Sequence, residues 1–443
     1  MREKYKLTEG DINASVEREK WHYEITDLQT REYLEKDARY FLHQAMSTPC
    51  IDVIGSNGDS SLINLRGKAY LDFHGNSLHQ VGFSNQFVID RIKKQLDECT
   101  FSTRRYTNKT AVDFAEKLIS ILPSGLSRVL FAPGGTSVNG IALKLARAVT
   151  GRHKVISYWD SFHGASLDMI SAGGEAVFRE GMGPLMPGAI RIPPPMTSGG
   201  FFTDEMQTVD YLEYVIEKEG EISAFIAEPI RNTDVQIPSK NYWKRIREIC
   251  TKHGIVLILD EIPTALGRTG KMFAFENFDI EPDILCLGKG LGAGIIPFAA
   301  MICREEYNIA PSVSLGHYTH EKSPLGCAAA HGVLDFIEQT ELLKKVELDE
   351  NWMNKKLFEL KARHSIIAEI RGIGLLWAVE LRKNGEPAIA ETEELMYACL
   401  RKGLSFKVSH GNTILLSPTL TIQREDLQEA ISILDQSLTN ISD

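Results

Sequence analysis

The sequence has few of the features that mark secreted, membrane-spanning or metal-binding proteins. Its 443 residues include only seven cysteines, an odd number with no CxxC pair, and its twelve histidines form no HExxH motif, which argues against a disulfide framework and a metal site. No apolar run approaches the roughly 18 residues of a membrane-spanning helix. The charged N-terminal stretch lacks the apolar core of a signal peptide. We therefore expect a cytoplasmic protein with reduced cysteines and neither a metal nor a membrane partner.

Charge of one sign is not concentrated anywhere either. The formal net charge of −10 is spread along the chain without a basic stripe, so nucleic acid is not expected as a partner. With 43% hydrophobic residues and 35 glycines, the chain can bury a large core. We expect an N-terminal segment, residues 1–70, that joins the small domain, a large domain of residues 71–329, and a small C-terminal domain of residues 330–443. The start of the N-terminal segment has helical spacing.

The run from residue 255 to 290 holds the strongest chemical signal. Ile255 to Leu259 is an unbroken aliphatic stretch that ends at Asp260, as a buried parallel strand does at its functional edge. Ile284 to Leu287 predicts a second such strand, and Lys289 follows it between two glycines. An amine held among apolar strand ends loses part of its hydration, which favours its neutral, nucleophilic form. The run thus predicts an acid and a reactive lysine at neighbouring strand ends.

This pair of side chains matches what pyridoxal phosphate requires. The cofactor needs an amine for covalent attachment and a carboxylate for its ring nitrogen, which Lys289 and Asp260 would supply. Taken alone, a lysine between two glycines after a strand is more often a solvated turn. The presence of both groups disfavours a catalytically silent protein on the same scaffold.

A cradle for the cofactor's phosphate also precedes this run. Val129 to Ala132 predicts a strand, Gly134, Gly135 and Thr136 follow, and residues 138–149 predict a helix. Glycines expose backbone N–H groups, a threonine adds a hydroxyl, and a helix N-terminus favours an anion. We interpret this segment as a phosphate site.

The motifs DE, GRTGKMFA, PDI and GKGLG, in this order from Asp260 to Gly292, resemble those of the class III (ω) aminotransferases. The resemblance covers nearly the whole chain after its first fifty or so residues. It implies an α/β protein of fold-type I, with a mostly parallel seven-stranded sheet in the large domain and a smaller α+β domain. It also implies that pyridoxal 5'-phosphate is bound to Lys289.

The resemblance further implies roles for individual residues. Phe162 would stack on the cofactor ring, His163 would orient Asp260, and Ile262 would cover the ring. Thr319 would reach the phosphate of the neighbouring subunit's cofactor, which implies a homodimer with shared active sites. The implied catalytic residues are Lys289 and Asp260, and the implied cofactor-binding residues are Gly135, Thr136, Phe162, His163, Glu228, Asp260, Ile262, Lys289 and Thr319.

Three departures from the family pattern concern the substrate. Arg231 stands in a loop where most members carry a glycine-rich sequence, Pro263 replaces a glutamine, and Leu415 stands where carboxylate-binding members have an arginine. The candidates for binding an anionic substrate group are Arg231, Arg104, Arg105 and Lys322. For the two adjacent arginines, 104 and 105, surface or interface ion pairs are the alternative.

These departures favour a lyase over a transaminase. A transaminase must bind a keto acid as its second substrate, whereas a lyase expels a β-substituent and releases an aldehyde and ammonia. Within the family, the chain resembles the small group of lyases that act on aminoethyl phosphates and phosphonates. This implies a role in phosphonate catabolism, close to the breakdown of 2-aminoethylphosphonate. The implied reaction is loss of water from (R)-1-hydroxy-2-aminoethylphosphonate, giving phosphonoacetaldehyde and ammonia. The alternatives are an ω-aminotransferase that uses pyruvate or 2-oxoglutarate, and a phospho-lyase acting on phosphoethanolamine.

Overall fold

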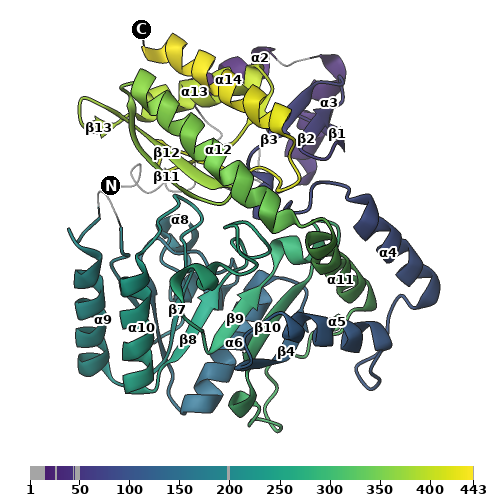
Figure 1. Ribbon diagram of the computed structural model, residues 1–443, viewed down its shortest axis with the longest axis vertical. Coiled ribbons are helices and arrows are strands. Elements are labelled where there is room, and N and C mark those ends of the chain that lie inside the picture. The colour runs from purple at the N-terminus through teal and green to yellow at the C-terminus, as the bar shows by residue number, and fades with distance from the viewer. Residues whose placement is uncertain (1–14, 25–26, 43, 45–49, 197–199, 443) are drawn as a thin grey trace.

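The largest element of the structure is a seven-stranded sheet at the centre of its lower body (Figure 1). The computed structural model describes residues 15–24, 27–42, 44, 50–196 and 200–442. The strand order is β4-β10-β9-β8-β7-β5-β6, and β10 alone runs opposite to the other strands of this sheet. The strands are β4 (Leu126–Ala132), β5 (Lys154–Tyr158), β6 (Ala189–Ile192), β7 (Ile222–Ala227), β8 (Val256–Asp260), β9 (Ile284–Leu287) and β10 (Ala299–Arg304). The predicted mostly parallel sheet is confirmed.

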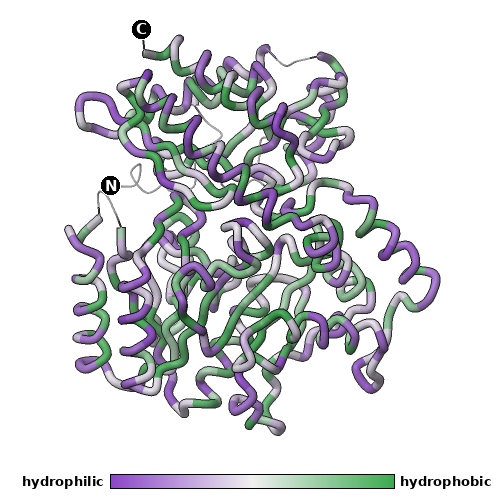
Figure 2. Tube along the Cα trace, in the orientation of Figure 1, coloured by the Kyte–Doolittle hydropathy of each residue, from purple (hydrophilic) through white to green (hydrophobic). Residues whose placement is uncertain are grey.

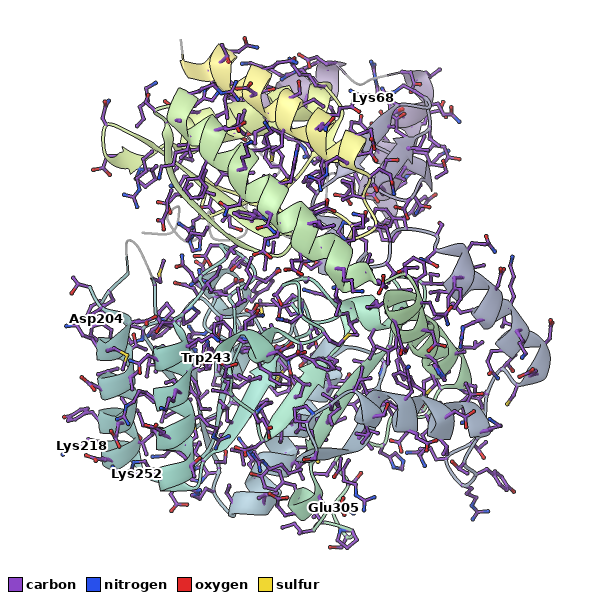
Figure 3. All side chains as sticks on the ribbon, viewed as in Figure 1. Lys68, Asp204, Lys218, Trp243, Lys252 and Glu305 are labelled. Atoms are coloured by element: carbon purple, nitrogen blue, oxygen red, sulfur yellow. The ribbon has the colours of Figure 1, made fainter. Side chains whose placement is uncertain are left out.

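Helices lie around this sheet, and the longer ones turn an apolar face inward. In α10, Ser239 caps the first turn by accepting from the backbone N–H of Tyr242 (3.1 Å), and Gly254 ends the helix in the left-handed conformation. Trp243 is buried between α10 and the rest of the body, whereas Lys252 lies on the outside (Figure 3). The helices are α4 (Gln86–Glu98), α5 (Lys109–Ser120), α6 (Gly135–Thr150), α7 (Leu167–Ala172), α8 (Ala176–Arg179), α9 (Glu205–Glu219), α10 (Lys240–His253) and α11 (Pro324–Gln339).

The upper body combines the two ends of the described chain (Figure 1). Its first sheet has the order β1-β2-β3-β14, in which N-terminal β3 pairs in parallel with C-terminal β14. Its second sheet has the order β11-β12-β16-β15, with β13 paired to β12. The strands are β1 (Ile54–Asn57), β2 (Ser61–Asn64), β3 (Ala69–Asp72), β11 (Ile367–Ile373), β12 (Leu376–Lys383), β13 (Glu386–Pro387), β14 (Leu404–Ser405), β15 (Lys407–Ser409) and β16 (Thr413–Leu416).

Helices also line the upper body, and short 3-10 turns mark loops in the lower one. The helices are α2 (Val16–Glu24), α3 (Leu28–Tyr40), α12 (Leu342–Arg363), α13 (Ile389–Arg401) and α14 (Arg424–Ser442). The 3-10 turns are η1 (Gly75–Ser77), η2 (Ala274–Phe278), η3 (Lys289–Gly292) and η4 (Glu305–Tyr307). The helical start predicted for the N-terminal segment is confirmed from residue 16 onward, while residues 1–14 lie outside the described part. The division of the chain at residues 70 and 329 stays a prediction.

Hydropathy follows burial through the molecule (Figure 2). The strands of the large sheet are mostly apolar, and every residue of β7, β8 and β9 is buried. Five of the seven cysteines are buried and two are partly buried, and all are free thiols. Among the described helices, none is both long enough and apolar enough to cross a membrane.

Candidate active site

A pocket of about 900 Å³ lies where the carboxyl ends of β7, β8 and β9 face the upper body. Parallel strands of an α/β sheet place their functional side chains at this edge. The pocket brings together all but one of the predicted cofactor residues: Gly135, Thr136, Phe162, His163, Glu228, Asp260, Ile262 and Lys289. The exception is Thr319. The pocket extends toward the N-terminal residues Arg18, Asp52 and Tyr70.

Asp260, at the end of β8, is held by donors from three segments. Its Oδ2 accepts from Asn139 Nδ2 (2.7 Å) and lies 2.9 Å from His163 Nδ1, and its Oδ1 accepts from the backbone N–H of Ile262 (3.2 Å). Asn139 also donates to the backbone carbonyl of His163 (2.8 Å), so the histidine and the carboxylate share one support. The carboxylate is therefore fixed in orientation at the pocket wall. Asn139 was missed in the sequence, although it lies on the sheet-facing side of α6.

Lys289 follows β9 and begins η3 with a φ of 47°. This left-handed conformation is rare for a residue other than glycine, and it persists at functional sites where the surroundings enforce it. The preceding Gly288 gives room to Ile262, whose Cγ2 would lie 3.3 Å from a Cβ added there. A Cβ added at Gly135 would lie 2.6 Å from Ile262 Cδ1, so this glycine is also required by close packing. Lys289, Ile262 and Asp260 thus share one wall of the pocket.

The N-terminus of α6 opens into the same pocket. The helix begins at Gly135, and the preceding Gly134 provides no side-chain cap. The first N–H groups of a helix lack intrahelical acceptors and favour an anion. Thr136 adds a hydroxyl that accepts from the backbone N–H of Ala165 (3.4 Å). Together with the aromatic ring of Phe162, these groups fit a cofactor that carries a phosphate and an aromatic ring.

Glu228, at the end of β7, is an acid poised near neutrality. Burial, followed by the nearby charge of Asp260, raises the pKa of Glu228 to about 7. Its Oε2 accepts from the backbone N–H of Asn232 (3.0 Å), and Asn232 Nδ2 donates to Ser77 Oγ (3.2 Å). Glu228 is therefore connected to the turn that follows β3.

The four basic residues predicted to meet an anionic substrate lie outside the residues that line this pocket. Arg231 is buried, with Nε 2.9 Å from Asp234 Oδ1 and Nη2 2.7 Å from His410 Nε2. Its neighbours Asn232 and Thr233 line the pocket instead. The substrate role of Arg231 stays a prediction, and its contacts in the structure are those of an ion pair inside the protein.

The other three, Arg104, Arg105 and Lys322, are exposed, and so is Thr319. Arg104 Nη2 lies 2.8 Å from His317 Nε2, and Asn108 Nδ2 donates to the backbone carbonyl of Lys322 (3.0 Å). The segments 101–108 and 316–322 therefore pack on each other at the surface of one chain. Their predicted roles stay predictions.

Several ionisable residues of the pocket wall, among them His74 and Lys407, were not singled out in the sequence. His74 follows β3, and Lys407 begins β15. The charges of Lys407 and Lys289, after burial, lower the pKa of His74 to about 3, so both lysines act on this ring. The polar HGNSLHQ segment was a signal for His74. No local motif marks Lys407, because only the pairing of β14 with β3 brings its strand to the pocket.

Comparisons with known proteins match nearly the whole chain. The family model for class III aminotransferases matches residues 45–438. The (R)-1-hydroxy-2-aminoethylphosphonate ammonia-lyase of Vibrio splendidus is 53% identical, over 98% of this chain and 95% of its own. The acetylornithine aminotransferase of Methanocaldococcus jannaschii is 31% identical, over 92% of this chain and 98% of its own. A pyridoxal phosphate-bound amine transaminase from an uncultivated Pseudomonas species has a TM-score of 0.84 at 29% identity, covering 91% of this chain and 99% of its own.

Proposed function

The chain belongs to the class III aminotransferase family, and from this premise we propose that it is an ammonia-lyase acting on (R)-1-hydroxy-2-aminoethylphosphonate. The products are phosphonoacetaldehyde and ammonia. The observation that carries the proposal is the 53% identity to the Vibrio splendidus ammonia-lyase over 98% of this chain. Relatives with other activities, such as the acetylornithine aminotransferase, are far less similar, at 31% identity.

The enzyme depends on pyridoxal 5'-phosphate, and its residues fit this cofactor. When bound, the cofactor withdraws electrons from the carbon next to the substrate nitrogen. Lys289 would hold the cofactor covalently, and its amine would take the proton from that carbon. Asp260, fixed by Asn139 and His163, would keep the cofactor's ring nitrogen protonated.

The phosphate and the ring of the cofactor would be held by separate parts of the pocket. Gly135 and Thr136, at the start of α6, would bind the phosphate. Phe162 and Ile262 would bind the ring, and Glu228 lies near Asp260 within the same site. These assignments rest on the shared pocket and on the match to the family pattern.

Lys407 supplies the charge that a phosphonate requires. It is half-buried, lines the pocket together with Lys289, and acts on the same His74 ring. A phosphonate carries negative charge, and a lysine binds such a group as a point charge. The amine of the substrate would face Lys289 while the phosphonate faces Lys407. Arg231 would support the pocket wall through its ion pair with Asp234.

We also place the enzyme in the cytoplasm as a homodimer whose active sites are shared. Thr319, Arg104, Arg105 and Lys322 are exposed in one chain, together with apolar neighbours such as Phe101, which is 41% exposed. In a dimer these residues would approach the site of the other subunit. Thr319 would bind the partner's cofactor phosphate, and the basic residues would raise the positive potential near the substrate.

The decisive experiment supplies the two enantiomers of 1-hydroxy-2-aminoethylphosphonate in separate assays, without any keto acid. It measures the ammonia and the aldehyde released from each. Multiple turnovers with the (R) enantiomer and few with the (S) enantiomer would support the proposal. Release of at most one equivalent of aldehyde, with turnover restored by pyruvate or 2-oxoglutarate, would instead establish an aminotransferase. Preference for phosphoethanolamine, with release of phosphate, would establish a phospho-lyase.

A further inference from the structure

The turn after β3 places in the pocket wall a histidine that cofactor binding does not use. His74 lines the pocket together with Lys289 and Lys407. Asp72 fixes the backbone before and after the Cα of His74. Its Oδ1 accepts from the backbone N–H of His74 (3.0 Å), and its Oδ2 accepts from the backbone N–H of Gly75 (3.0 Å). The position of His74 therefore does not depend on its own side chain making a bond.

The turn is held in a conformation that the chain would not adopt freely. Gly75, Asn76 and Ser77 have φ values of 47°, 46° and 57°, which are unfavourable for the two residues other than glycine. Ser77 Oγ accepts from Asn232 Nδ2 (3.2 Å), which ties the turn to the wall that carries Glu228. Backbone strain of this kind persists where the surroundings determine it, and it is typical of functional sites.

Resting on the proposed function, we infer that His74 donates the proton with which the hydroxyl of the substrate leaves as water. Hydroxide is a poor leaving group, so the elimination needs an acid at the hydroxyl oxygen. The electron pair of the bond between the α-carbon and its hydrogen becomes the new carbon–carbon double bond. The proton released from the α-carbon goes to Lys289. The carbon–oxygen bond breaks with its electron pair on oxygen, which takes the proton of His74. Water then hydrolyses the freed enamine to the aldehyde and ammonia.

The position of His74 suits the carbon at which the bond breaks. The hydroxyl is attached to the carbon that carries the phosphonate, and the amine is attached to the next carbon. A donor for this hydroxyl must therefore lie near both the group that meets the amine and the group that meets the phosphonate. His74 shares the pocket with Lys289 and Lys407 and lies within electrostatic reach of both.

Three other acids of the pocket, His163, Tyr70 and Glu228, are engaged elsewhere. His163 lies 2.9 Å from Asp260 through its Nδ1, and Tyr70 donates its hydroxyl to Asp52 (2.8 Å). Glu228 lies in the field of Asp260 and accepts a hydrogen bond from the backbone N–H of Asn232. Glu228 is the strongest rival, and its variant belongs in the test.

Binding of the substrate changes the charge balance around His74. In the free protein the ring is neutral, because burial and the charges of Lys407, on β15, and Lys289, after β9, disfavour its protonation. Asp72 of β3 contacts the backbone of His74, and His79 follows in the same segment. A phosphonate beside Lys407 offsets that lysine's charge, so the imidazole takes up a proton only when a substrate is present. The substrate's ammonium group, which must lose a proton before reacting, is its source.

The test separates removal of the α-proton from departure of the hydroxyl. We compare the wild-type holoenzyme with His74→Gln, which keeps an amide donor but has no proton to transfer, and with Glu228→Gln. In His74→Gln we expect ammonia release from the hydroxy substrate to fall by about 10² to 10⁴-fold. Solvent deuterium should still enter the α-carbon of recovered substrate at close to the wild-type rate. The analogue with fluoride in place of the hydroxyl, which needs no proton to leave, should react within a few-fold of wild type.

Binding gives a readout that is independent of turnover. The dissociation constant for 2-aminoethylphosphonate, which has no hydroxyl, should be unchanged in His74→Gln when measured by calorimetry. His253→Gln, on the surface of α10, is the matched control and should behave as wild type. If deuterium exchange or fluoride elimination falls as much as ammonia release, His74 acts in binding or in α-proton removal and the inference is wrong. It is also wrong if Glu228→Gln alone shows the selective loss. Absence of ammonia release by wild type would overturn the proposed function instead.

Discussion

The pocket has two walls of different origin. Gly135, Thr136, Glu228, Asp260 and Lys289, which we call the strand-end wall, come from the edge of the seven-stranded sheet. His74, Asn76, Ser77 and Lys407, which we call the turn wall, come from opposite ends of the chain and meet because β3 pairs with β14. The first wall carries the chemistry that the family shares. Under the proposed function, the second carries the groups that meet the phosphonate and the hydroxyl of the substrate.

The two walls also differ in how their charges are supported. Asp260 accepts three hydrogen bonds, from Asn139, His163 and Ile262, and is fixed before any ligand arrives. His74 is held through its backbone, and its protonation depends on the lysines that share its pocket. A fixed charge suits a cofactor that stays bound, whereas a group whose charge responds to the ligand suits a substrate that comes and goes.

The largest expected effect tests whether the strand-end wall carries the chemistry. Lys289→Ala should lower kcat for ammonia release by at least about 10⁴-fold, because it removes both the covalent anchor and the base. The visible absorbance of the bound cofactor should also change. Lys252→Ala is the control, because this lysine lies on the outer face of α10 (Figure 3) and pairs with Glu213 of α9. A Lys289→Ala enzyme with most of its activity would remove the distinction between the walls.

The next effect concerns stability rather than catalysis. Arg231→Met should lower the free energy of unfolding by about 3–5 kcal/mol, because it leaves Asp234 as a buried charge without its guanidinium partner. Urea unfolding of the holoenzyme measures this change. The double variant Arg231→Met/Asp234→Leu should recover much of the loss. Arg245→Met, in an exposed pair with Glu248, is the matched control and should cost about 1 kcal/mol or less. A stable Arg231→Met enzyme with a raised KM would mean that Arg231 binds the anionic group of the substrate.

The turn wall is tested by Lys407→Met. Loss of a charge-assisted contact worth about 1.5–3 kcal/mol should raise KM for the phosphonate by roughly 10 to 100-fold, with a smaller change in kcat. Lys407→Arg should keep part of the affinity, because it keeps the charge. Lys402→Met, on the exposed end of α13, should leave KM unchanged. An unchanged KM in Lys407→Met would mean that the phosphonate lies elsewhere, for example near the basic residues of a partner subunit.

These contrasts explain how much of the site the sequence could reveal. Asp260 and Lys289 were identified because each follows a short apolar run, and parallel strands bring their carboxyl ends to one edge. The phosphate cradle was found for the same reason, since strand, glycines and helix are consecutive. The helix begins at Gly135 rather than at the predicted residue 138, because Gly134 already takes the capping position.

The turn wall could not be found in this way. Lys407 reaches the pocket through a pairing between strands from opposite ends of the chain, which no local pattern predicts. Arg231 shows the converse, because its residue type suggested anion binding while its burial beside Asp234 depends on the folded chain. Sequence patterns thus predict the elements that consecutive residues form. Whether a side chain reaches the site depends on its orientation in the folded chain.

The smallest expected effect concerns the pH dependence of the segment behind the turn wall. Burial, followed by the charge of Arg268, lowers the pKa of His79 to about 3 from its ordinary value of 6.5. Below pH 6.5 the unfolded chain binds a proton that the folded protein does not. As the pH is lowered, the free energy of unfolding therefore decreases by up to about 1.4 kcal/mol per pH unit for this group.

Comparison of His79→Asn with wild type isolates this contribution. Asp72, whose pKa burial raises to about 6, has the opposite effect on stability, but it is present in both proteins. When the pH is lowered from 7 to about 5.5, the free energy of unfolding measured in urea should therefore decrease less in His79→Asn than in wild type. The difference should be up to about 1.4 kcal/mol. The slope is the readout, so a destabilised variant remains informative. Equal slopes would mean that His79 is protonated in the folded protein, and that the segment behind the turn wall accepts charge without a ligand.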